Sequence, residues 1–198
     1  MILIIDTATA ACSVALIEGG AAIDERHELI GRGHAERLLP MIRELLAGRR
    51  PASILVDCGP GSFTGVRVGV AAAHGLAIGW QVPVSGYSSM SIIAAAAGAD
   101  VAVALQGGHG QIFVQSFGHD PLAASDELRS LPPREAAAGI AAPLVLGSGA
   151  EALVSARGHG EAREALPRAA DAALLPHALR SLPARPIYGR APDARPMQ

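Results

Sequence analysis

The sequence contains no lysine, because all sixteen of its basic residues are arginine, and asparagine is absent as well. Without lysine the chain cannot form a Schiff base, hold a phosphate as P-loop proteins do, or make the Lys–Glu ion pair of protein kinases. Genomic base composition accounts for such a bias without selection on function. Whatever the origin of the bias, the absence of lysine excludes these kinds of enzyme.

A basic surface and metal-binding patterns are missing too. The formal net charge of −2 argues against a large surface that grips nucleic acid unaided, so any role in RNA chemistry would act through a partner. Cys12 and Cys58 lie in apolar stretches, as buried thiols of a cytoplasmic protein do. No two histidines are four residues apart, which predicts no helical metal site.

Residues 68–99 contain no Asp, Glu, Lys or Arg, a run that resembles a membrane span. Pro83 and Gly86 interrupt it, and its helical part is shorter than the ~20 residues that a bilayer requires. The start of the chain meets a charge at Asp6, too early for a signal peptide. We therefore expect a buried core and no membrane association.

The length allows one domain, or two small lobes that share a core. Apolar runs and their periods predict an α/β chain whose second half restarts the strand, strand, helix order of the first, which divides it into residues 1–99 and a smaller part 100–198 that ends in an extended Pro/Arg-rich tail from Pro183. The predicted strands are 2–5, 13–18, 21–30, 53–58, 82–85, 101–105, 111–117 and 144–146. The predicted helices are 34–47, from 62 or 64 to 80, 88–97 and, more weakly, 151–157 and 169–182.

A glycine-rich turn, residues 57–69 (DCGPGSFTGVRVG), joins a predicted strand to a predicted helix. Helix amino termini attract anions, so a phosphate loop is physically allowed. The residues that would form it are Asp6, Thr7, Thr9, Gly61 and Ser62. The turn matches neither dinucleotide nor P-loop spacing, and Ser62 lacks the glycines of a nucleophile elbow. A tight turn that requires close packing is the simpler interpretation.

The first two helices each carry a face of apolar or small side chains. We predict that these faces form a partner or dimer interface, since small side chains let another helix approach closely. The predicted interface residues are His34, Leu38, Met41, Ile42 and Leu45 on the first helix, and Gly65, Val66, Gly69, Val70, Ala73 and Ala77 on the second.

The segment Gly59–Gly69 (GPGSFTGVRVG) resembles the signature of the TsaB (YeaZ) family. Residues 4–7, 34–42, 75–77, 82–90 and 186–190 are similar to other parts of that family, closely over the first hundred residues and thinly afterwards. The resemblance implies an actin-like ATPase fold (ASKHA, ribonuclease H-like) of two lobes, each a mixed β-sheet flanked by helices.

The resemblance also implies a function without catalysis by this chain. TsaB-like proteins pair with the transferase TsaD and the ATPase TsaE to make threonylcarbamoyladenosine (t6A) in tRNA. TsaD-like proteins carry a His-x-x-x-His metal motif after the second helix, and residues 87–92 here contain no histidine. The resemblance therefore implies no catalytic residue and no metal in this chain.

The implied partners are TsaD and TsaE, with a homodimer when TsaD is absent, and tRNA is met only through the complex. No intrinsic cofactor is implied, and ATP or ADP is expected only at the subunit junction. Gln106–Gly108 replace an Asp-Ala-Arg-like motif of relatives, and the chain is shorter than many of them, which leaves the contacts of the second lobe open. The alternative is an enzyme in its own right, an ASKHA-type ATPase or a glycoprotease-like peptidase.

Overall fold

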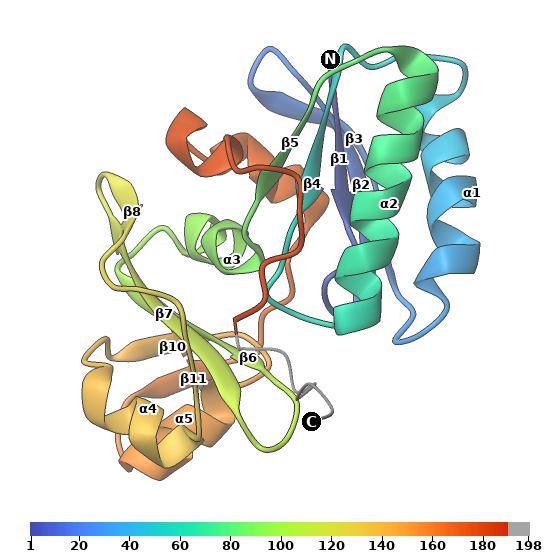
Figure 1. Cartoon of the computed structure of the whole chain (residues 1–198). Helices are drawn as coiled ribbons and strands as arrows, with labels where there is room; N and C mark the ends of the chain where they lie inside the picture. The colour runs from blue at the N-terminus through green and yellow to red at the C-terminus, as the bar shows by residue number, and fades with distance from the viewer. Residues whose placement is uncertain (190–198) are drawn as a thin grey trace, which may run out of the picture.

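The computed structural model describes residues 1–189 and contains two mixed β-sheets with helices packed on them (Figure 1). The first sheet has the order β3-β2-β1-β4-β5. Its strands are β1 (Ile2–Asp6), β2 (Ala11–Glu18), β3 (Ala21–Leu29), β4 (Ser53–Asp57) and β5 (Val84–Tyr87). β1 lies at the centre, antiparallel to β2 and parallel to β4, so the carboxyl ends of β1 and β4 meet at one edge of the sheet.

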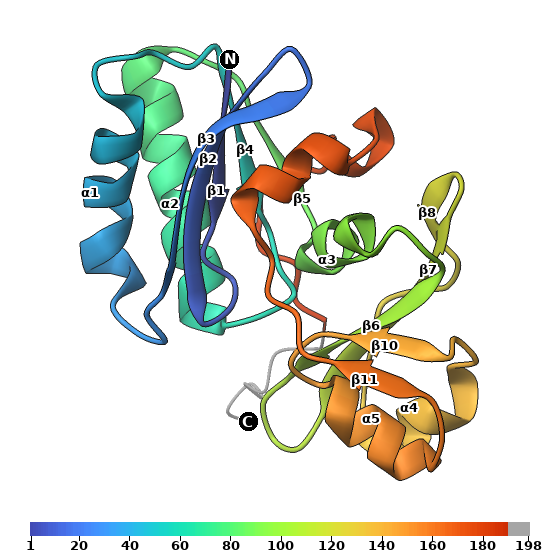
Figure 2. The same cartoon turned by 180° about the vertical axis from the view of Figure 1, so that it is seen from behind.

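Helices α1 (His34–Leu46) and α2 (Phe63–Trp80) lie side by side on one face of this sheet (Figure 1). Alternation along β1 decides which core each residue joins. Leu3 and Ile5 pack with α1 and α2, whereas Ile4 faces α3 (Ser89–Ala97) on the opposite side (Figure 2). The first sheet is therefore buried on both faces.

The second sheet has the order β11-β10-β6-β7-β8, with β9 also paired to β7. Its strands are β6 (Val101–Gln106), β7 (Ile112–His119), β8 (Leu122–Ala124), β9 (Arg129–Leu131), β10 (Leu144–Leu146) and β11 (Glu161–Arg163). Helix α3 packs between the two sheets, while α4 (Pro133–Gly139) and α5 (Ala150–Arg157) cover the outer face of the second. The predicted two-lobed α/β fold is confirmed.

The predicted helix over 169–182 is wrong. The structure has two 3₁₀ helices there, η1 (Ala169–Leu174) and η2 (His177–Arg180), separated by Leu175 and Pro176. Pro176 has no N–H to donate and disfavours helical backbone at the residue before it. Helix α4 and the short strands β8, β9 and β11 escape prediction. The three strands lack the run of large apolar residues that marks β10, which is equally short.

After β11 the chain returns to the first sheet through η1 and the segment 182–189, called here the C-terminal strap. Gly86 of the edge strand β5 exchanges two backbone hydrogen bonds with Leu182 (N···O 2.7 and 3.0 Å), and the Ile187 N–H donates to the Cys58 carbonyl (2.7 Å). The predicted extended tail begins at Pro183, and its residues 190–198 lie outside the described residues. The lobe boundary after residue 99 stays a prediction.

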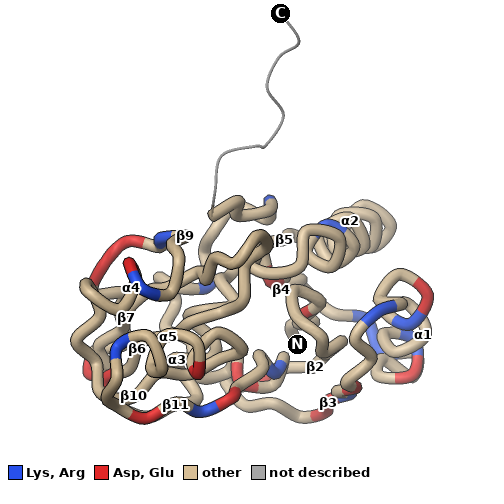
Figure 3. Tube along the Cα trace, turned by 90° about the horizontal axis from the view of Figure 1, so that it is seen from below, with Lys and Arg blue, Asp and Glu red and all other residues tan. Residues whose placement is uncertain are grey.

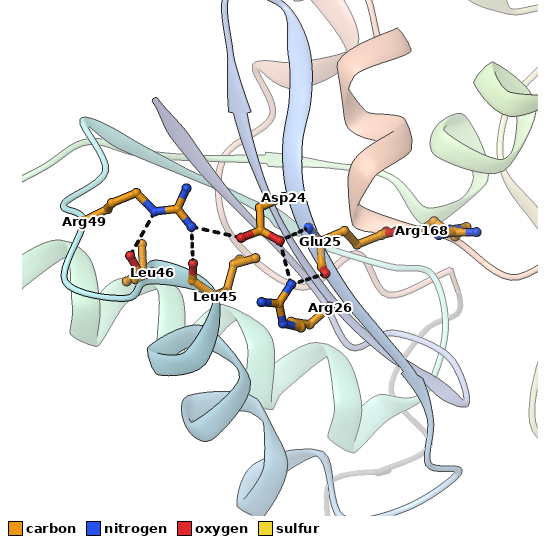
Figure 4. Close-up of polar contacts among 7 residues, drawn as sticks. All are labelled: Asp24, Glu25, Arg26, Leu45, Leu46, Arg49 and Arg168. Carbon is orange, nitrogen blue, oxygen red and sulfur yellow. Dashed lines mark hydrogen bonds and ion pairs between the residues drawn. The ribbon is translucent and has the colours of Figure 1, made fainter.

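Two neighbouring carboxylates of β3 fasten elements on opposite sides of the strand (Figure 4). Asp24 accepts a hydrogen bond from Arg49 (3.0 Å), which also donates to the last carbonyls of α1. Glu25 pairs with Arg168 and accepts from the backbone N–H of Ala170 (3.2 Å) at the start of η1.

Within residues 1–189, no helix combines the length and apolarity that a membrane span requires.

Candidate functional site

The loop after β1 lies directly on the first turns of α2. The Thr7 hydroxyl donates to the Gly65 carbonyl (2.7 Å), and the Ser62 N–H donates to the Ala8 carbonyl (2.6 Å). A Cβ added at Gly61 would lie 2.1 Å from the Ala8 carbonyl oxygen, and one at Gly65 would lie 2.1 Å from that of Thr7. The glycines of the turn therefore allow contact between α2 and this loop.

Two buried carboxyl groups meet where β1 and β4 end. The Asp6 and Asp57 side chains are close enough to affect each other's pKa. Tyr87 donates its hydroxyl to Asp6 (2.8 Å), and Ser89 donates to Asp57 (2.6 Å). Burial, followed by the neighbouring Asp6 charge, raises the pKa of Asp57 well above its ordinary value. Burial also raises the pKa of Asp6. Burial therefore favours a proton on this carboxyl pair.

Replacing Asp57 with asparagine is expected to keep the fold and to reduce the loss of stability on raising the pH. The folded wild type retains a proton that the unfolded chain releases above pH ~4, so its free energy of unfolding falls as pH rises from there through the raised pKa. Asparagine donates an N–H in place of that proton and does not titrate. Urea unfolding of both proteins at pH 5 and pH 8 measures the effect, and equal pH slopes would contradict the shared proton.

A cavity of about 1180 Å³ opens between the two lobes. The first lobe contributes residues 8–10, Leu29 and the start of α2, the second lobe contributes 105–108 and Phe113, and the strap closes one side with 186–189. Among the predicted phosphate-loop residues, Thr9, Gly61 and Ser62 line this cavity. Asp6 and Thr7 are fully buried and bonded within the protein, so they do not face it.

An aromatic and arginine cluster, Phe63, Arg67 and Tyr188, lies on the cavity wall. The Arg67 guanidinium stacks on the Phe63 ring, with its central carbon 3.5 Å from the ring centroid. Arg67 also donates two hydrogen bonds to the Tyr188 hydroxyl (3.2 and 3.0 Å). Both rings remain more than half exposed. The cluster joins two segments that resemble family motifs and are separated by over a hundred residues of chain.

The structure places the predicted interface side chains inside the chain itself. Their faces of α1 and α2 pack on the first sheet, so they are not available to a partner. The buried residues are His34, Leu38, Met41, Ile42, Leu45, Gly65, Val66, Gly69, Val70, Ala73 and Ala77. The two helices stay a predicted partner surface only through their opposite faces, because periodicity marks an apolar face without showing what covers it.

The opposite face of α2, called here the outer face, is exposed at Ala71, His74, Gly75, Ile78 and Gly79. Ile78 is 80% exposed. Arg67 is the one charged residue of α2, and Figure 3 shows this helix almost uncharged beside α1, which carries both signs. The outer face is therefore a largely apolar strip on a long helix. His74 contacts the Ala184 carbonyl there (2.8 Å), and within residues 1–189 Ile78 stays open to solvent.

Reactive groups elsewhere in the described chain offer little chemistry. Burial raises the pKa of the Cys12 thiol to about 11 and that of Cys58 to about 12, so both stay protonated near neutral pH. In the described part of the chain, no three His, Cys, Asp or Glu side chains gather in a way that could hold a metal ion. The Ser181 hydroxyl lies 3.4 Å from His177 Nδ1 but donates to the His177 carbonyl at 2.7 Å.

Sequence reasoning misses the partners of Asp6 and of Arg67. Asp57 ends an apolar run, as Asp6 does, and a carboxylate at the end of each of two parallel strands is a signal that could find the pair. Tyr87 and Ser89 follow no apolar run and give no such signal. Tyr188 gives no such signal, since its approach to Arg67 depends on the path of the strap.

A family model for tRNA N6-adenosine threonylcarbamoyltransferase (TsaD) matches residues 27–127, about half of the chain. The chain is 43% identical over 98 residues to the tRNA threonylcarbamoyladenosine biosynthesis protein TsaB of Escherichia coli. That alignment covers 47% of this chain and 42% of the E. coli protein, so the chain matches less than half the length of that relative.

Two solved structures from Pseudomonas aeruginosa are similar over nearly the whole chain. One, described as an uncharacterized protein with similarity to peptidase YeaZ, is 31% identical, with a TM-score of 0.81 and coverage of 96% of this chain and 99% of that one. The other, YeaZ, is 29% identical, with a TM-score of 0.78 and coverage of 94% and 98%.

Proposed function

Because this chain belongs to the TsaB (YeaZ) family, we propose that it is the non-catalytic subunit of the complex that makes threonylcarbamoyladenosine in tRNA. In this proposal it binds and activates the transferase TsaD, works together with the ATPase TsaE, and meets tRNA through the complex. Nucleotide at the subunit junction and a homodimer formed without TsaD are parts of the same proposal.

The outer face of α2 is the observation that carries the proposal. Gly75 and Gly79 lie inside a helix, and a Cβ added at either would meet nothing within 4 Å. A glycine at such a position costs roughly 1 kcal/mol relative to alanine, and no close approach within residues 1–189 requires it. Together with the exposed Ile78, the two glycines would allow a partner helix to approach closely. We propose that this helix belongs to TsaD.

Reconstitution of the reaction tests the proposal. Threonylcarbamoyl transfer to tRNA is measured with purified TsaD, TsaE and the threonylcarbamoyl adenylate, with and without this chain. We expect no transfer by this chain alone and a strong dependence of TsaD on its addition. Transfer by TsaD and TsaE at the same rate without this chain would contradict the activating role.

The enzyme alternative has little geometric support in residues 1–189. The Ser181–His177 contact joins neighbouring turns of one exposed segment, and the serine proton is directed to a carbonyl oxygen and not to the ring. A serine nucleophile requires its base to accept that proton. Steady peptide or ATP hydrolysis by the isolated chain, lost on substituting a named residue, would favour the alternative.

A further inference from the structure

The first sheet has two edge strands, and the chain closes one of them with backbone. Gly86 of β5 exchanges two hydrogen bonds with Leu182 of the strap. The other edge strand is β3, which spans nine residues and, among residues 1–189, pairs with β2 alone. Such a strand offers N–H and C=O groups to any extended segment that meets it, and proteins commonly protect it from pairing. Two features of β3 serve this purpose.

The first feature is an irregularity near the start of β3. The register with β2 shifts between Leu16 and Ile17, and Ile23 is the extra residue on β3. An extra residue of this kind bends and twists the strand, which hinders pairing at that end. The part of the edge that another strand could join therefore lies beyond Ile23, in the titratable run 24–28 (DERHE).

The second feature is a clamp that Asp24 and Arg26 form around Glu25, the middle residue of β3 (Figure 4). One carboxylate oxygen of Asp24 accepts the Glu25 N–H (3.0 Å), and the Arg26 guanidinium donates to the Glu25 carbonyl (2.7 Å). Arg26 also donates to the same Asp24 oxygen (2.6 Å). An N–H has a single hydrogen to donate, so Glu25 turns it away from β2 and toward the free edge.

We propose that the Asp24–Arg26 clamp closes the β3 edge against β3 of a second copy of this chain. A strand that adds to the centre of β3 must bond to the Glu25 N–H and carbonyl, and the clamp already occupies both groups. A second copy is the occupant that the clamp excludes, because two identical edges can pair about a two-fold axis and each supplies the groups that the other requires.

The stability of the folded chain does not account for the clamp. The Asp24 and Arg26 side chains are 27% and 41% exposed, and ion pairs open to solvent contribute little to stability. The pair nevertheless lies at the middle of the free edge, with both of its members bonded to one residue's backbone. Its position is therefore explained by the pairing that it prevents.

The test replaces both clamp residues with threonine, which favours strand and stays polar. The background is Ile78→Asp, which puts a charge on the outer face of α2 so that a homodimer through that face does not contribute. In a β3–β3 dimer the two Glu25 residues would exchange two hydrogen bonds, each contributing roughly fivefold to association. Asp24→Thr/Arg26→Thr is therefore expected to dimerise at about 25-fold lower concentration than the background, as measured by sedimentation velocity.

Arg49→Ala in the same background is the matched control. It removes the hydrogen bond from Arg49 to the other Asp24 oxygen (3.0 Å) and leaves the clamp in place. This variant should dimerise no more than the background does. Dimerisation equal to that of the double variant would overturn the proposal, because the link between Asp24 and α1, and not the clamp, would then keep the chains apart.

Hydrogen exchange shows whether the new dimer uses this edge. In the double variant the Glu25 amide should exchange more slowly as protein concentration rises, because it becomes bonded to the second copy. Dimerisation without slower exchange in β3 would overturn the proposal, and so would a folded double variant that dimerises no more than the background.

A single substitution keeps the test decisive if the double variant fails to fold by circular dichroism. Arg26→Thr frees the Glu25 carbonyl and retains the hydrogen bond between Asp24 and Arg49. Its dimerisation should strengthen about fivefold over the background. A folded Arg26→Thr protein with unchanged dimerisation would contradict the clamp.

Discussion

Ile78→Asp is expected to weaken binding to TsaD, the partner proposed above, at least about 30-fold while the isolated chain stays folded. Ile78 is 80% exposed on the outer face of α2, so a carboxylate there remains in water in the free protein. In the complex it would be buried without a partner charge, and such a group costs several kcal/mol. Loss of a hot-spot contact at the centre of an interface costs about 2 kcal/mol or more, which corresponds to the stated factor. Calorimetric titration measures the affinity.

Leu174→Asp is the matched control, because it makes a similar change at another exposed apolar side chain. Leu174 is 57% exposed and ends η1, which packs on the opposite face of the first sheet from α2 (Figure 2). We expect this variant to bind TsaD normally. If Ile78→Asp also binds normally and both proteins melt as the wild type does, the outer face of α2 is not the TsaD surface.

Gly65→Ala is expected to destabilise the chain by at least about 3 kcal/mol. The added Cβ would lie 2.1 Å from the Thr7 carbonyl oxygen, so either the loop after β1 or the first turn of α2 must move. Overpacking of this kind typically costs 1–3 kcal/mol, and more where backbone cannot yield. The same shift would strain the hydrogen bond from Thr7 to the Gly65 carbonyl. Urea unfolding followed by circular dichroism measures the loss.

Gly75→Ala provides the contrast on the same helix. Nothing lies within 4 Å of the added Cβ, and alanine favours helix by roughly 1 kcal/mol over glycine. This variant should therefore be more stable than the wild type. If alanine at 65 and at 75 changed stability equally, helix propensity alone would explain both results and the close approach of the β1 loop would carry no cost.

The first lobe is predictable from sequence because its elements are long and their periods are clear. The apolar run 2–5 and the faces of α1 and α2 show their periods within single segments. The sequence does not show what covers those faces, because Leu38 and Ala73 are apolar whether a sheet or a partner lies over them. Only the three-dimensional path of the chain shows that the first sheet already occupies these faces, and that the outer face of α2 is the one left open.

The candidate site is less predictable because its contacts join distant segments. The motif with Phe63 and Arg67 and the motif with Tyr188 are each visible in the sequence. The contact between them depends on the path of the strap, which pairs with the edge strand β5. Asp6 and Asp57 end two apolar runs, and their contact follows from the parallel pairing of β1 and β4. The second-lobe predictions fail where a short strand has no run of large apolar residues, as at β11, or where proline divides a helix, as at Pro176.

The pairing of Leu182 with Gly86 also sets an order of events during synthesis. The edge of β5 finds its backbone partner only after about a hundred further residues have been made, and translation at about 5–20 residues per second delays this by several seconds. During that interval the newly made amino-terminal half presents an unpaired strand edge, which other chains can join. A chain interrupted before the strap would keep that edge of β5 unpaired, and with it the tendency to join other chains.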